Sequence, residues 1–169
     1  LLGWPPLFLR VYEQPPNGFG WIIRPTRKDY GEFIQLIDKL MSDNLNTNFF
    51  EGQVEEFSLK RNADGSEEKV RKGTIAMIED WLTARFRMPD PEPLKEVFKT
   101  FRDIRSPRSK HAHAVVDNAY EGGLFDKQKR LTARAYRAVQ GLRLAFQRHP
   151  LLAGYQPPSD LEDVKIWLG

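Results

Sequence analysis

The chain has 169 residues, 40% of them hydrophobic, and no cysteine, so it can bury one ordinary core and cannot form disulfides or thiolates. No apolar run approaches the roughly 18 residues of a membrane span, and residues 1–9 lack the basic start of a signal peptide. We therefore expect a cytoplasmic protein with no membrane partner. The net charge of +3 is uneven, because residues 101–149 carry eleven Lys and Arg against four Asp and Glu, which modestly favours a polyanionic partner.

The first 25 residues are β-prone rather than helical. Residues 7–12 and 20–24 are short β-prone runs on either side of a Pro-Pro-Asn-Gly turn. Two strands alone are marginal in water, so we expect them to end an upstream domain or to lie on the rest of the chain. The sequence also begins at Leu1 rather than at methionine, and we expect it to be a piece of a longer protein.

Residues 26–150 show helical patterns. Thr26 with Asp29 three residues later predicts a helix start, and apolar residues follow on one face to Met41. Residues 49–59 have a weaker pattern that fits a short helix before the polar loop 61–65. Ser66 is expected to open a long second helix, which Pro89 ends.

Asp90 then reads as the N-cap of a third helix. Pro107 falls inside its pattern and predicts a break, with Ser106 capping a fourth helix that ends at the glycine pair 122–123. Asp126 is expected to start a long final helix, which Pro150 ends. The tail predicts a short helix over residues 159–167.

The predicted fold class is therefore all-α, an antiparallel four- to five-helix bundle. The predicted organisation is a β-prone segment over residues 1–25, the bundle over residues 26–150, and a tail with a short helix over residues 151–169.

Residues 105–113 carry the strongest functional indication. They hold three basic residues and two of the three histidines of the chain, and histidine is the side chain that titrates near neutral pH. If Pro107 begins a helix, Arg108 and Ser109 lie in its first turn, where free backbone N–H groups bind anions. Positions 108 and 113 differ by about 140° in direction on a straight helix, so convergence needs a kink, side-chain reach or a second copy.

The run from Arg108 to His113 resembles the Arg-(four to six residues)-His motif of the HEPN (higher eukaryotes and prokaryotes nucleotide-binding) superfamily. Helical bundles of that family are often bacterial, and many are metal-independent ribonucleases of toxin–antitoxin and antiviral systems. The motif covers six residues, and residues 26–150 share the helix order. Ser109 stands where the family commonly has asparagine. Arg105 and His111 form a second match.

The resemblance implies an endoribonuclease that leaves 2′,3′-cyclic phosphate ends, without a cofactor. His113 would act as general base or acid, Arg108 would stabilise the phosphorane charge, and Ser109 would orient either group. It also implies a homodimer with the site at its interface, RNA as partner, and an antitoxin or upstream domain as a further one. The residues expected to guide the RNA backbone are Arg105, Lys110, His111, Lys127 and Arg130.

Other interpretations remain open for the same residues. His113 fits equally a structural histidine bonded to a neighbour, and His111 a solvent-facing one. On a helix these two imidazoles point about 160° apart, so no metal site is predicted. The alternative function is a catalytically silent helical dimerisation or docking module in which residues 105–113 form only an elbow.

Overall fold

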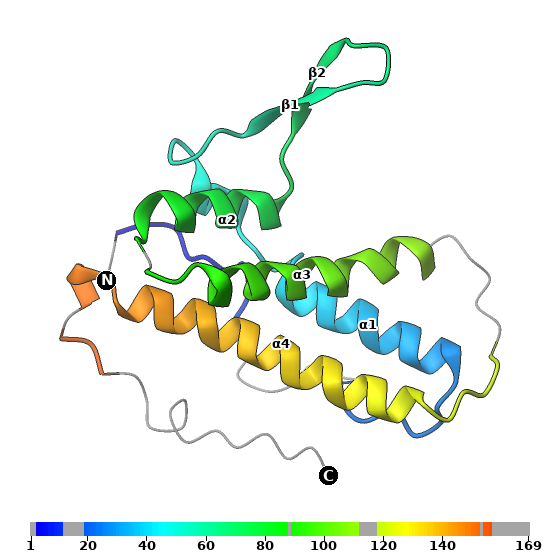
Figure 1. The fold of residues 1–169 in the computed structure, drawn as a ribbon. Coiled ribbons are helices and arrows are strands. Elements are labelled where there is room, and N and C mark those ends of the chain that lie inside the picture. The colour runs from blue at the N-terminus through cyan, green and yellow to red at the C-terminus, as the bar shows by residue number, and fades with distance from the viewer. Residues whose placement is uncertain (1–2, 12–18, 88, 112–117, 153, 157–169) are drawn as a thin grey trace.

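Three long helices form the body of the protein, α1 (Arg27–Met41), α3 (Glu92–His111) and α4 (Leu124–Gln147) (Figure 1). The computed structural model describes residues 3–11, 19–87, 89–111, 118–152 and 154–156. Helix α3 runs antiparallel to both α1 and α4, and α2 (Thr74–Arg85) packs at the end where α3 begins. Two short 3₁₀ turns, Thr47–Phe50 and Pro150–Leu152, complete the helical elements of these residues.

Helix α1 begins as the sequence predicts. The Thr26 hydroxyl accepts a hydrogen bond of 3.2 Å from the Asp29 backbone N–H, which satisfies a donor that the first turn would otherwise leave free. Its buried face carries Phe33, Ile34 and Ile37. Most of this face packs against α3, so the first helix is fixed against the helix that carries the candidate motif.

An aromatic cluster joins α2 to the end of α4. The Trp81 ring is fully buried and stacks on Phe146 at a centroid distance of 5.3 Å, with Phe49 edge-on at 5.1 Å. Its indole N–H donates to the Gln53 side-chain oxygen at 2.9 Å. The Trp81 ring therefore belongs to the core, and its burial excludes a base-stacking role.

Helices α3 and α4 approach closely because small residues line the α4 face. Ala135 and Ala138 are buried on α4, and a Cβ atom at Gly141 would lie 2.9 Å from the Val97 Cγ2 atom. Helix α4 begins at Leu124, two residues before the predicted start at Asp126.

We expect Gly141→Ala to lower the free energy of unfolding by about 1 kcal/mol. Alanine gains up to about 1 kcal/mol of helix propensity, but overpacking a core costs about 1–3 kcal/mol. Urea unfolding measures the net effect, and combining it with Val97→Ala should remove the clash contribution. If Gly141→Ala alone is more stable than the wild type, the close approach of α3 and α4 at this glycine is contradicted.

The all-α prediction is wrong, because the fold mixes helices with an antiparallel two-stranded sheet. Strands β1 (Phe57–Arg61) and β2 (Glu67–Arg71) pair Leu59 with Lys69 across the hairpin. The polar loop is the hairpin turn, in which Gly65 has φ +84° and the Asn62 N–H donates to the Ser66 carbonyl at 2.8 Å.

The hairpin also corrects the predicted second helix. That helix was expected to open at Ser66, but Val70, four residues later, lies in β2 and is 36% exposed. Helix α2 starts only at Thr74, after Gly73. The short helix expected within residues 49–59 is replaced by a 3₁₀ turn over Thr47–Phe50. This turn overlaps the predicted segment only at Phe49 and Phe50. The hairpin pairing of β1 with β2 thus replaces the helix that the weak pattern predicted.

The predicted break at Pro107 is also wrong. Helix α3 continues through it to His111, so no new helix starts at Ser106. Proline removes the N–H that would bond the Asp103 carbonyl and normally costs about 3 kcal/mol. Asp103 lies on the exposed side of the helix, where water can satisfy that carbonyl, and burial of Phe101 and Ile104 holds the helix in place.

The structure describes part of the β-prone segment predicted at the N-terminal end, but not the short helix predicted at the C-terminal end. In residues 3–11 and 19–25 the structure has no paired strands beyond one isolated bridge of Phe8 to Leu45. These residues lie on the bundle, since the Leu9 N–H donates to the Asn44 carbonyl and the buried Gln128 side chain bonds the backbone of Gly20 and Ile22. The short helix predicted for residues 159–167 falls outside the described residues.

Candidate functional site

The candidate motif lies at the C-terminal end of α3. Arg108, Ser109, Lys110 and His111 are helical residues of its last turns, and His113 lies outside the described residues. Position 108 follows Phe101 by seven residues and Ile104 by four, so it continues the stripe along which both of those side chains are fully buried. The arginine of the motif therefore occupies a position on the core-facing side of α3.

A buried carboxylate lies on the facing helix. Asp38 has no exposed surface and belongs to the buried face of α1. The Arg105 guanidinium lies 3.5 Å from the Asp43 carboxylate just beyond the end of α1. Because α1 and α3 are antiparallel, Asp38, which precedes Asp43 in the chain, lies further toward the end of α3 that carries the motif than the contact of Arg105 with Asp43.

This buried acidic group is the feature that the sequence interpretation missed. Asp38 follows Ile34 by four residues and precedes Met41 by three, so it lies within the apolar face of the predicted helix. A carboxylate within the apolar stripe of a helix is a signal for burial, because burying a charge is costly unless it is paired. The neighbouring Ser42 hydroxyl is also fully buried and makes no hydrogen bond among the described residues.

We expect Asp38→Asn to lower the free energy of unfolding by about 1–3 kcal/mol, because it changes a fully buried polar group. The control is Asp43→Asn, which removes an exposed ion pair and should cost less than about 1 kcal/mol. Urea unfolding of the two variants compares them directly. If both variants lose the same free energy of unfolding, the burial of Asp38 makes no contribution of its own to stability.

The predicted RNA-binding residues divide into two groups. Lys127 and Arg130 lie near Tyr30 at the start of α1, where burial raises the pKa of the Tyr30 phenol against the opposing effect of these two cations. Arg105 lies instead beside Asp43, at the other end of α1. The thirteen residues from Tyr30 to Asp43 correspond to about 20 Å of helix, so the structure does not bring these three bases together.

Lys127 is already engaged by a carboxylate. Its ammonium lies 2.5 Å from Glu121, and Arg27 lies 3.5 Å from the other oxygen of the same carboxylate. The hydrogen bond and charge of Lys127, followed by those of Arg27, hold the pKa of the Glu121 carboxyl below its usual value. An anionic ligand at this end would have to compete with Glu121 for both cations.

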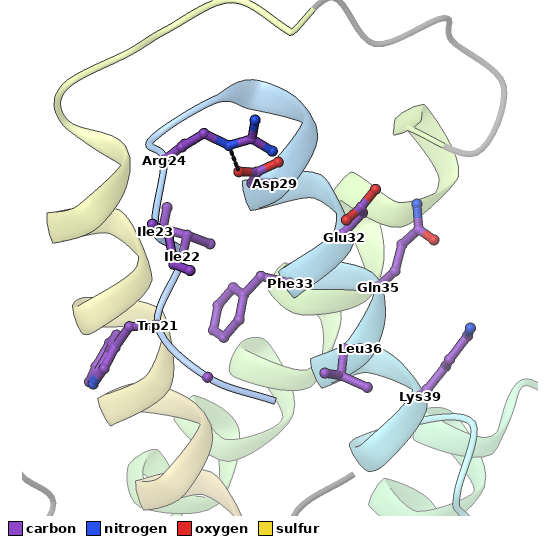
Figure 2. Close-up of a pocket in the computed structure, with 11 residues that line it drawn as sticks. Trp21, Ile22, Ile23, Arg24, Asp29, Glu32, Phe33, Gln35, Leu36 and Lys39 are labelled. Atoms are coloured by element: carbon purple, nitrogen blue, oxygen red, sulfur yellow. Dashed lines mark ion pairs between the residues drawn. The ribbon is translucent and has the colours of Figure 1, made fainter. Parts of the chain in front are cut away.

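A shallow cavity of about 650 Å³ lies between residues 20–24 and helix α1. Figure 2 shows Phe33 and Ile22 inside it, with the ion pair of Arg24 and Asp29 at one edge, 3.4 Å apart. None of the predicted site residues lines this cavity. Its mixed charges do not form an acid–base pair suited to catalysis.

The described residues contain no group of three or more His, Cys, Asp or Glu side chains that could hold a metal ion. Within the same residues, no helix has both the length and the apolar character needed to cross a bilayer. No known protein family, curated protein or solved structure matches the chain.

Proposed function

We propose that this protein is a metal-independent endoribonuclease of the HEPN type, acting as a homodimer in a bacterial toxin or antiviral defence system. The observation that supports the proposal is the unbroken course of α3, which keeps position 108 on the stripe of Phe101 and Ile104, while the facing helix α1 carries the buried Asp38. A carboxylate on the facing helix would hold a guanidinium in one orientation and leave its other N–H groups for phosphate.

In the proposed reaction His113 removes the proton of the ribose 2′-hydroxyl, and the oxygen attacks the adjacent phosphorus. The bond from phosphorus to the 5′-oxygen breaks, and that oxygen takes a proton from an imidazolium or from water. The products are a 2′,3′-cyclic phosphate and a 5′-hydroxyl. Arg108 stabilises the negative charge of the phosphorane, and Ser109 orients the reacting groups.

A second copy completes the proposed site. Positions five apart on a straight helix differ by about 140° in direction, and α3 has no break at Pro107 over its described residues, which end at His111. Sedimentation velocity of the whole chain should accordingly give a dimer.

The direct test incubates the chain with mixed single-stranded RNA in the presence of EDTA and analyses the new ends. We expect cleavage that persists in EDTA, with cyclic phosphate on the upstream product. Products ending in a 3′-hydroxyl, or cleavage that EDTA abolishes, would contradict the proposed chemistry.

The docking alternative is favoured by one observation, the exposure of both strands of the hairpin along their whole length. Leu59 is 70% exposed on β1, and an exposed strand edge can pair with another copy. This alternative predicts no RNA cleavage and weaker self-association of Leu59→Lys in sedimentation velocity.

A further inference from the structure

A second cavity, of about 920 Å³, lies at the opposite end of the bundle from the candidate motif. It forms where the end of α2, the start of α3 and the end of α4 meet (Figure 1). Pro93 lines it, and fifteen residues of α3, about 22 Å, separate Pro93 from Arg108. The cavity is therefore a separate feature, and its volume falls within the range of about 300–1,000 Å³ that is typical of small-molecule sites.

The walls of this cavity are largely apolar. Trp4, Phe86 and Leu144 line it, and Leu144 is 46% exposed. The Trp4 ring is held by edge-on contacts with Trp81 at 5.8 Å and with Phe49 at 6.0 Å. A fixed aromatic ring beside an exposed leucine favours a flat, apolar ligand body, because such a body would remove that surface from water.

The charges around the cavity are mainly positive and partly uncompensated. Arg85, Arg87 and Arg148 line it against a single carboxylate, Asp90. Arg85 is engaged, since it lies 4.9 Å from the Trp81 ring and donates to Gln53 at 3.2 Å. Asp90 is also engaged, because one of its oxygens accepts the Glu92 N–H at the start of α3.

Arg87 and Arg148 differ from these two residues. Among the described residues, neither guanidinium makes a hydrogen bond or an ion pair. Two unpaired guanidinium groups at one apolar cavity suit an anionic group that accepts several hydrogen bonds. A phosphate carries more charge and more acceptor oxygens than a carboxylate, so it suits two guanidiniums better.

We propose that this cavity binds a small aromatic anion, with its ring against Trp4, Phe86 and Leu144 and its anionic group, preferably a phosphate, between Arg87 and Arg148. The site goes beyond the proposed ribonuclease activity and does not depend on it. RNA cleavage at the far end of α3 can fail while ligand binding here succeeds, and the reverse also holds.

Isothermal titration calorimetry with four probes tests the proposal on the whole chain. The probes are 1-naphthyl phosphate, 1-naphthoate, the neutral 1-naphthalenemethanol and inorganic phosphate. We expect 1-naphthyl phosphate to bind most tightly, 1-naphthoate less so, and the neutral ring and the bare ion at least about tenfold more weakly than the aryl phosphate. Equal affinity for the neutral and anionic aryl probes would overturn the role of the arginines.

Variants locate the binding. Arg148→Gln and Arg87→Gln should each weaken 1-naphthyl phosphate roughly tenfold or more, since a charge-assisted hydrogen bond is lost. Arg137→Gln is the matched control, because it removes the same charge from an exposed position of α4 outside this cavity. Leu144→Glu should abolish binding by placing a carboxylate at the mouth. Binding unchanged by these three cavity substitutions, or reduced equally by Arg137→Gln, would overturn the proposal.

Discussion

Arg108→Ala is expected to reduce the rate of RNA cleavage by about 100-fold or more while leaving the protein folded. A donor aimed at the charge that develops in a transition state contributes on the order of 100–1,000-fold to the rate. Position 108 is one where such a donor can be held in place, because the facing helix α1 carries the buried Asp38. The measurement is the initial rate on one RNA substrate in EDTA, with circular dichroism confirming the helix content.

Two further variants make this prediction specific. Arg108→Lys keeps the positive charge but loses the planar guanidinium group, so its rate of RNA cleavage should lie between those of Arg108→Ala and the wild type. Arg137→Ala removes an arginine from an exposed position of α4 and should cut as fast as the wild type. If Arg108→Ala and Arg137→Ala have the same rate, Arg108 has no catalytic role.

Trp81→Ala is expected to cause the largest loss of stability, about 3–5 kcal/mol in the free energy of unfolding. The substitution empties the centre of the aromatic cluster and leaves the Gln53 side chain without its indole donor. It should also loosen α2 from the end of α4, since the ring stacks on Phe146.

Urea unfolding followed by circular dichroism measures the effect. The control is Trp21→Ala, because the Trp21 side chain is 48% exposed and its removal should cost much less. A loss below about 1 kcal/mol for Trp81→Ala would contradict the central place of this ring in the core.

The sequence predicted those parts of the fold in which local pattern and tertiary packing agree. The start of α1 follows from the Thr26 cap, and the buried stripe of α4 follows from its helical spacing. The hairpin was missed because its strands are short and exposed on both faces, so neither burial nor a long alternation marks them. Its best local sign was the turn around Gly65, which reads equally as a loop between helices.

Pro107 shows a different limit of sequence reasoning. Proline lowers the stability of a helix interior, but the outcome depends on whether the freed carbonyl can reach water and on how firmly the preceding turn is packed. Neither property of Asp103 or Ile104 can be obtained from local sequence alone. Asp38 differs, because its place in the apolar stripe of α1 is visible in the sequence, although the helix that covers it is not.

The site itself was predictable only as a set of residue types. The motif in residues 105–113 indicates the proposed chemistry through Arg108 and His113, but spacing alone did not separate Arg105 from Lys127 and Arg130. The structure separates them by about the length of α1, because Arg105 pairs with Asp43 while the other two lie near Tyr30. Long-range helix pairing decided this arrangement, and the sequence carries no local trace of it.

The most direct measurement compares wild type with His113→Ala in a cleavage assay on mixed single-stranded RNA with EDTA present. We predict that the wild type cuts the RNA and leaves 2′,3′-cyclic phosphate ends. Loss of the general base or acid should slow His113→Ala by about 100- to 10,000-fold. Cleavage by His113→Ala at the wild-type rate, or no cleavage by either protein, would contradict the ribonuclease assignment.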